Sequence, residues 1–204
     1  MYSPSAFTIA EAGVIRSFVQ RHSFGLLLSL NGEEIKDTHT PMFLSEDGKY
    51  LFGHIARAND QWKSWAISPG IRAIFHGPHC YISPRFYQGT FNVPTWNYTA
   101  VSIVGKISLV DSLPEQKEII RHLIASYEAG AEQPWQLDES DEKMMKLFEA
   151  IVCFRIEIET IEAKFKLNQN KSPEDQASVI AHLRARGTQD DLAVAALMAK
   201  NLGA

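Results

Sequence analysis

The residues best suited to hold a ligand lie in the segment Gly53-His54-Ile55-Ala56-Arg57-Ala58-Asn59. This order of residue types places the end of a strand directly before the start of a helix. Such a junction collects free backbone N–H groups, the positive end of the helix dipole and, here, a guanidinium and a side-chain amide. The chemistry predicted is the binding of phosphate or a similar anion. The alternative stays open that Arg57 is a solvated surface residue and Asn59 only a helix cap.

A second segment, Val93-Pro94-Thr95-Trp96-Asn97-Tyr98, ends a long loop, Pro84 to Tyr98, in a region rich in aromatic residues. Rigid amphipathic side chains on an ordered loop suit a planar heteroaromatic ligand or a subunit interface. A small hydrophobic cluster that pins the loop is the alternative, at equal weight.

The third segment is Lys164-Phe165-Lys166-Leu167-Asn168-Gln169-Asn170-Lys171. Two lysines at alternate strand positions point to one face, and amide side chains follow at once. An anion contact and a solvated strand end explain this pattern equally well.

Two further segments carry histidines. Thr38-His39-Thr40-Pro41 places an imidazole between two hydroxyls, where an ordinary edge-strand histidine is the preferred interpretation. His76-Gly77-Pro78-His79-Cys80 has three residues that bind metals, yet no second cluster completes a tetrahedral set, so no metal site is predicted. Gly77-Pro78 is interpreted as a turn. No nucleotide-binding, hydrolase or zinc-protease motif is present, and no catalytic residue is predicted.

The elements that position these segments are mainly strands. Apolar runs and turn residues predict about six short strands in the first half with little helix between them, at 24–30, 35–44, 50–55, 72–76, 80–83 and 101–110. This pattern favours an antiparallel sheet closed as a barrel.

The remaining segments are predicted to be mostly helical. Thr8 and Glu11 have the spacing of a capping box that opens a first helix. A second helix is expected from Ser112, where Glu115 completes the same spacing, to Gly130, and a third over 141–149. A half-exposed strand is expected at 154–159. Two tail helices follow, the first from Ser172 to Gly187 and the second from Thr188 to Lys200. We therefore expect one domain over 1–170 and a C-terminal helical tail over 171–204.

Composition excludes several classes of protein. The chain has 204 residues, 45% of them hydrophobic, and a formal net charge of −4, which argues against a protein that binds nucleic acid over its whole surface. No apolar run approaches the roughly 20 residues that span a bilayer, and Met1 to Ala12 lacks the features of a signal peptide. A cytoplasmic protein without a membrane partner is expected, with Cys80 and Cys153 as reduced core residues.

Taken together, the motifs resemble the PaiB family of FMN-binding split-barrel proteins. The resemblance is carried above all by Pro94-Thr95-Trp96-Asn97-Tyr98 and Lys164-Phe165-Lys166-Leu167-Asn168-Gln169-Asn170, and also by Thr38-His39-Thr40-Pro41, Gly53 to Asn59 and Tyr81-Ile82-Ser83-Pro84. It covers essentially the whole chain. Asn168 stands where the family usually has serine, and Asp60 where it usually has proline.

This resemblance implies a mainly β fold with some α-helix: a six-stranded antiparallel split barrel like that of pyridoxamine phosphate oxidase, with flanking helices. It also implies a homodimer with FMN at the subunit interface. The phosphate would lie near Arg57 and Asn59 with Lys166 assisting, and Trp96 and Asn97 would reach across from the partner. The cofactor-binding residues so predicted are Thr38, His39, Thr40, His54, Ala56, Arg57, Asn59, Thr95, Trp96, Asn97, Lys166 and Gln169.

The function implied by the resemblance is negative transcriptional regulation of the protease-synthesis and sporulation type. DNA is then a candidate partner, through a tail with six Lys or Arg and four Asp or Glu over residues 164–204. The acidic start of the last helix, Asp190-Asp191, faces phosphate unfavourably and favours a packing or dimerisation element instead. The alternative function is a flavin-dependent oxidoreductase that acts on a small molecule with NAD(P)H, with His39 and His54 as flavin neighbours only.

Overall fold

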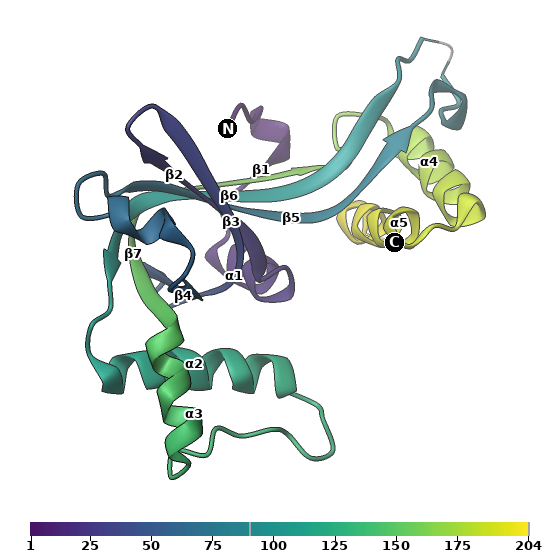
Figure 1. The fold of residues 1–204 in the computed structure, drawn as a ribbon. Helices are drawn as coiled ribbons and strands as arrows, with labels where there is room; N and C mark the ends of the chain where they lie inside the picture. Colours follow the sequence, from purple (N-terminus) through teal and green to yellow (C-terminus); the bar gives the residue numbers. More distant parts are fainter. Residues whose placement is uncertain (90, 204) are drawn as a thin grey trace. The chain divides into compact units, whose positions relative to one another are not determined.

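The computed structural model describes residues 1–89 and 91–203 of the chain (Figure 1). Its strands join into one sheet in the order β1-β7-β4-β3-β2-β5-β6, and an additional pairing of β6 with β7 closes six of them into a ring. The pairings of β2 with β3 and β5, and of β4 with β3 and β7, are antiparallel. The predicted six-stranded antiparallel barrel with added helices is therefore confirmed. The strands are β1 Thr8–Ile9, β2 Phe24–Asn31, β3 Glu34–Leu44, β4 Tyr50–Ala56, β5 Gly70–Ile82, β6 Thr95–Leu109 and β7 Ile151–Lys166.

The helices are mostly those that the sequence predicts. They are α1 Ala12–Arg21, α2 Leu113–Glu128, α3 Glu142–Lys146, α4 Pro173–Arg186 and α5 Gln189–Leu202, with short 3-10 turns η1 Ser5–Phe7, η2 Asp60–Ser64, η3 Pro84–Phe86 and η4 Leu147–Ala150. Within the described residues, no helix combines the length and apolar character needed to cross a membrane.

The chain forms two compact units. The first comprises Met1–Ile15, His76–Val101 and Glu162–Ala204, and the second comprises Arg16–Phe75 and Ser102–Ile161. Strands β5, β6 and β7 each contribute residues to both units. The separate tail domain predicted for residues 171–204 stays a prediction.

The core of the second unit follows from the two-residue period of its strands. In β2, Leu27 and Ser29 are buried, while their neighbours Leu26 and Leu28 on the opposite face are only partly covered. Ala73 and Phe75 of β5 alternate in the same way. Burial of each large apolar side chain contributes about 1.5–3 kcal/mol. The inner faces of the strands thus fill the barrel.

Helix α2 covers part of the outer face of the sheet. Its residues Ile119 and Leu123 form a buried cluster with Val110 and Cys153, against which Phe43 and Phe52 of β3 and β4 pack. The apolar residues of α2 recur at three- and four-residue intervals, so one side of the helix meets the strands.

In the first unit, α4 and α5 pack against each other (Figure 1). Ser172 caps α4, Gly187 ends it in the left-handed conformation, and Thr188 and Asp191 form a complete capping box at the start of α5. These boundaries confirm the prediction for the two tail helices. The buried face of α5 is made by Val194, Ala195, Met198 and Ala199.

Some predicted boundaries are wrong. Strand β5 runs unbroken through Gly77-Pro78, so these residues make no turn. Strand β6 begins at Thr95, so the last four residues of the expected loop, Thr95 to Tyr98, are strand. Thr8 lies in β1 and bonds Ser3 and Pro4, so it does not cap α1. The side chain of Ser112 makes no capping bond at α2. In each case local turn and cap chemistry is overridden by long-range strand pairing or tertiary contacts.

Pro41 does not break β3, which continues to Leu44. The pairing register with β4 begins at Met42, directly after the proline, and the register with β2 extends to Phe24 opposite Pro41. Because proline has no N–H to donate, the ladder is interrupted on one side only.

Closure of the ring depends on a close approach of β6 to β7 at Gly105. A methyl group at this position would overlap the carbonyl oxygen of Glu157 and lie 2.9 Å from Cγ2 of Ile156. We expect Gly105→Ala to lower the free energy of unfolding by about 3 kcal/mol, since a backbone atom cannot move aside cheaply. Urea denaturation measures this. Gly13→Ala in α1, where nothing lies within 4 Å of the added methyl, is the control and should be neutral or stabilising. Equal stability of both variants would contradict this account of closure.

Candidate functional site

Two of the predicted ligand residues in the second unit, Thr38 and Asn59, belong to a buried polar network. Asn59 Nδ2 donates to Thr38 Oγ1 at 2.7 Å, and Thr38 Oγ1 donates to Gln61 Oε1 at 2.5 Å. Gln61 is 2% exposed, and its Nε2 donates to Ser29 Oγ at 3.0 Å and to the carbonyls of Leu27 and Lys36. Asn59 also caps η2 by accepting from the backbone N–H of Gln61. The structure brings these side chains together as an internal support of η2.

Arg57 lies on the surface next to this network. Its Nε donates to the carbonyl of Glu149 at 2.6 Å and its Nη2 to that of Ile151 at 2.8 Å. The guanidinium carbon stands 6.0 Å from the ring centroid of Trp62. The Nη1 group takes part in neither bond, so a fixed cationic edge is left for an anion. Ala56 contributes its carbonyl, which accepts from the N–H of Asn59.

The three residues His39, Thr40 and His54 divide between the two faces of the sheet. Thr40 is buried inside, and its hydroxyl donates to the carbonyl of His54. His39 is exposed outside, with its ring stacked on Phe24 at 5.9 Å. The His54 imidazole also lies outside but is half-buried, and its Nδ1 has no hydrogen-bond partner. Burial lowers the pKa of His54, so the ring is neutral at physiological pH.

In the first unit, the predicted residues Thr95, Trp96 and Lys166 lie together. Lys166 Nζ donates to the hydroxyl of Thr95 and, at 2.9 Å, to the carbonyl of Trp96. Burial and the neighbouring charge of Lys164 lower the pKa of Lys166. Lys164 Nζ donates to the carbonyl of Tyr2 at 2.9 Å and lies above the rings of Tyr2 and Tyr98.

The two ammonium groups Lys164 and Lys166 bear like charge, and within the described residues neither forms an ion pair with a carboxylate. A bound anion would offset this repulsion by its opposite charge. The end of β7 therefore carries two cations without a carboxylate partner among the described residues.

Asn97 and Gln169 lie within the first unit in structural roles. Asn97 is fully buried; its Nδ2 contacts the sulfur of Met198 at 3.4 Å, and its Oδ1 has no partner. Gln169 Oε1 accepts from the N–H of Leu167 at 2.7 Å, and its Nε2 donates to the carbonyl of Phe165. Gln169 thereby closes the turn after β7.

An exposed aromatic surface surrounds Trp96, which is 54% exposed. The rings of His79 and Tyr81 lie 6.3 Å and 6.1 Å from its centroid. These two residues were not among the predicted ligand residues, because Gly77-Pro78 was expected to form a turn. A continuous strand through position 82 would have predicted that 79 and 81 share one face.

The cysteine in the same segment is buried. Burial, with the negative charge of Asp191, raises the pKa of the Cys80 thiol to about 12, and burial raises that of Cys153 to about 11. Both thiols are free. Across residues 1–89 and 91–203, no cluster of three histidine, cysteine or acidic side chains is arranged to hold a metal ion.

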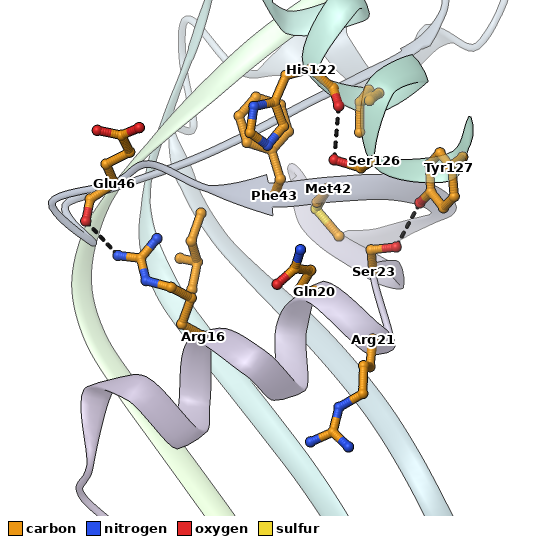
Figure 2. Close-up of a pocket in the computed structure, with 12 residues that line it drawn as sticks. Arg16, Gln20, Arg21, Ser23, Met42, Phe43, Glu46, His122, Ser126 and Tyr127 are labelled. Carbon is orange, nitrogen blue, oxygen red and sulfur yellow. Dashed lines mark hydrogen bonds between the residues drawn. The ribbon is translucent and has the colours of Figure 1, made fainter. Parts of the chain in front are cut away.

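A cavity of about 320 Å³ lies between the Arg16–Arg21 part of α1, β3 and α2 (Figure 2). Arg16 Nη1 donates to the carbonyl of Ser45 at 2.9 Å, and the hydroxyls of Ser23 and Tyr127 bond at 2.6 Å. In Figure 2, the Arg21 guanidinium points away from the other lining residues. None of the predicted ligand residues lines this cavity, and the Arg16 and hydroxyl groups that face it already bond one another or the backbone.

Comparison with known proteins gives a family match. Residues 1–160 match the family described as "Putative FMN-binding domain". The chain is also 34% identical over 205 residues to the protease synthase and sporulation protein PAI 2 of Bacillus subtilis, covering 99% of this chain and 98% of that protein.

Solved structures share the fold. A FAD- and heme-binding protein of Mycobacterium smegmatis has a TM-score of 0.63 at 10% identity, covering 84% of this chain and 79% of that one. A conserved hypothetical protein of Mycobacterium tuberculosis has a TM-score of 0.60 at 12% identity, covering 83% and 92%. At these identities the likeness concerns the architecture alone.

The buried His54 makes stability depend on pH. Its pKa in the folded chain lies below the ordinary 6.5 of the unfolded chain. As the pH falls below 6.5, the unfolded chain therefore binds a proton that the folded chain resists, and the free energy of unfolding decreases. We expect His54→Phe to weaken this decrease in urea titrations at a series of pH values. Part of the decrease should remain in this variant, because the pKa of His22 is also lowered, by burial and by Arg21. An unchanged pH slope in His54→Phe would contradict the assignment.

Proposed function

We propose that this chain, which belongs to the "Putative FMN-binding domain" family together with the B. subtilis PAI 2 protein, binds FMN as a homodimer and acts as a negative transcriptional regulator. The family match over residues 1–160 is the observation that carries the flavin assignment. The name of the relative supports a role in protease synthesis and sporulation. The hydroxyl–carboxylate pairs Ser45–Asp47 and Ser140–Asp138 are exposed and join residues two positions apart. Because neither pair lies among the predicted ligand residues, we propose a binding protein in preference to an enzyme.

Two cationic groups suit the phosphate of FMN. Arg57 has a guanidinium held in place by two backbone carbonyls, with Nη1 left over. Lys166, beside Lys164, is a cation without a carboxylate partner among the described residues. Phosphate bound at fixed guanidinium and ammonium donors gains charge-assisted hydrogen bonds. We propose that Arg57 binds the phosphate and that Lys166, in the other unit, is a second candidate donor.

Exposed rings suit the isoalloxazine. Trp96 with His79 and Tyr81 in the first unit, and His39 stacked on Phe24 in the second, offer flat surfaces to a planar ligand. Thr40 and Asn97 are buried. We propose that they support their exposed sequence neighbours, His39 and Trp96, without contacting the flavin.

We propose that a second copy of the chain binds at the outer face of β2. Phe24, Leu30 and Ile35, at the two ends of the β2–β3 hairpin, are 65%, 49% and 66% exposed, and Leu26 and Leu28 between them are partly covered. A run that is apolar on both faces is typical of a strand buried on both sides. Such a contiguous apolar surface marks a protein interface, and a second copy presents the same apolar surface in return.

Removal of a phosphate-binding cation should weaken FMN binding. We expect Arg57→Ala and Lys166→Ala each to raise the dissociation constant of FMN about tenfold or more, since a charge-assisted contact contributes about 1.5–3 kcal/mol. Quenching of flavin fluorescence measures the constant. Lys63→Ala, an exposed lysine on η2, is the matched control and should bind like the original protein. Equal constants in all four proteins would eliminate the proposed phosphate site.

The tail helices give little support to direct DNA recognition. Arg186 at the end of α4 pairs with Asp191, which is 1% exposed, and also donates to the carbonyl of Tyr81 at 3.1 Å. This pairing lowers the pKa of Asp191 to about 2. Asp190 at the start of α5 would repel DNA phosphate. We therefore propose that α4 and α5 serve packing, and that repression involves another DNA-binding protein.

A gel-shift titration tests whether the protein binds DNA directly. With the purified protein and promoter fragments of secreted-protease genes, we expect no complex whose affinity depends on salt. Direct phosphate contacts would show an affinity that falls steeply, by about 10³-fold for six contacts, between 50 and 200 mM salt. A salt-sensitive complex of that kind would contradict indirect regulation.

A further inference from the structure

A second pocket, of about 400 Å³, lies over the outer face of the sheet in the second unit. Helix α2 forms one wall with Ile120 and Ile124, and the segment around Trp135 and the turn η4 with Phe148 form others. This volume falls within the range of about 300–1,000 Å³ that is usual for small-molecule sites. The lining is almost entirely apolar.

His54 is a polar residue in this lining. Its Nδ1 is buried without a hydrogen-bond partner. A neutral imidazole carries one N–H and one bare nitrogen, and a buried N–H without an acceptor is rarer in proteins than an unused acceptor. The proton is therefore assigned to Nε2, which makes the other edge of the ring a hydrogen-bond donor.

The other polar groups of the lining already have partners. The hydroxyl of Tyr127 bonds Ser23 at 2.6 Å, and the carboxylate of Glu128 accepts from the backbone N–H of Trp135 at 3.0 Å. His54 is thus the half-buried polar group that remains for a ligand, beside the exposed indole N–H of Trp135 at the rim. Glu128 would repel an anion.

The rim of the pocket is aromatic and open. Tyr127, Trp135 and Leu147 are 56%, 48% and 62% exposed, although all three are large apolar residues that line it. Aromatic side chains around an apolar cavity favour flat apolar ligands over aliphatic chains.

We propose that this pocket binds a small uncharged aromatic molecule whose one hydroxyl or carbonyl oxygen accepts a hydrogen bond from His54. The ring of the ligand lies among the apolar side chains of α2, Trp135 and Phe148. This proposal departs from the resemblance, which assigned His54 to the flavin, and it does not depend on flavin binding.

Calorimetric titration with two probes tests the site. The probes are 4-propylphenol and propylbenzene, which differ only in the hydroxyl group, added to the full-length protein without FMN. We expect the phenol to bind about tenfold more tightly, because one well-formed hydrogen bond contributes about 1–1.5 kcal/mol. In His54→Phe, which keeps an aromatic ring but loses its nitrogens, the two probes should bind within about twofold of each other.

His122→Phe is the matched control. His122 lies on α2 against Phe43 and does not line this pocket, so the tenfold preference should persist in that variant. Equal binding of both probes to the original protein, absence of saturable binding, or an unchanged preference in His54→Phe would overturn the proposal. Competitive loss of phenol binding when the protein is saturated with FMN would show that the pocket belongs to the flavin site, and would overturn it as well.

Discussion

Strand β2 is apolar on both faces, and a closed ring of strands can bury only one of them. Leu27 lies inside the barrel with no exposed surface, whereas Phe24 and Leu30 on the outer face are largely open. Helix α2 covers the part of the outer face formed by Phe43 and Phe52, where the buried cluster of the second unit lies. We propose that a second copy of the chain covers the remaining part, in which case a ligand site at that surface would take residues from both copies.

Ring closure sets where the functional side chains can lie. The approach of β6 to β7 leaves no room for a side chain at Gly105. The approach of β3 to β4 leaves none at Gly53, where a methyl group would lie 2.9 Å from the carbonyl oxygen of Pro41. Strands β6 and β7 carry Trp96 and Lys166 in the first unit, and both strands also contribute residues to the second unit. Arg57 and His39 lie in the second unit, so the flavin residues predicted from the sequence fall into two groups.

The sequence predicted strands β2, β3 and β4 and the tail helices well because their signals are local. Asn31-Gly32 turns β2 into β3, and Thr188 with Asp191 caps α5 as its spacing indicates. The fold itself came from the resemblance of whole motifs. The sequence could not show that Gly77-Pro78 lies within a strand, because the pairing of β5 with distant strands outweighs the local turn preference. It also could not tell that Thr38 and Asn59 bond Gln61, since hydroxyl and amide groups suit a buried network and a ligand equally well.

The flavin residues remain a prediction, and the family match, the unpaired lysines and the uncovered strand face support it together. The most direct measurement is gel filtration with light scattering on the protein mixed with excess FMN, followed by a visible absorption spectrum of the eluted peak. The account predicts a peak with twice the mass of one chain that retains flavin absorption at one FMN per subunit. A monomeric peak without flavin absorption would contradict it.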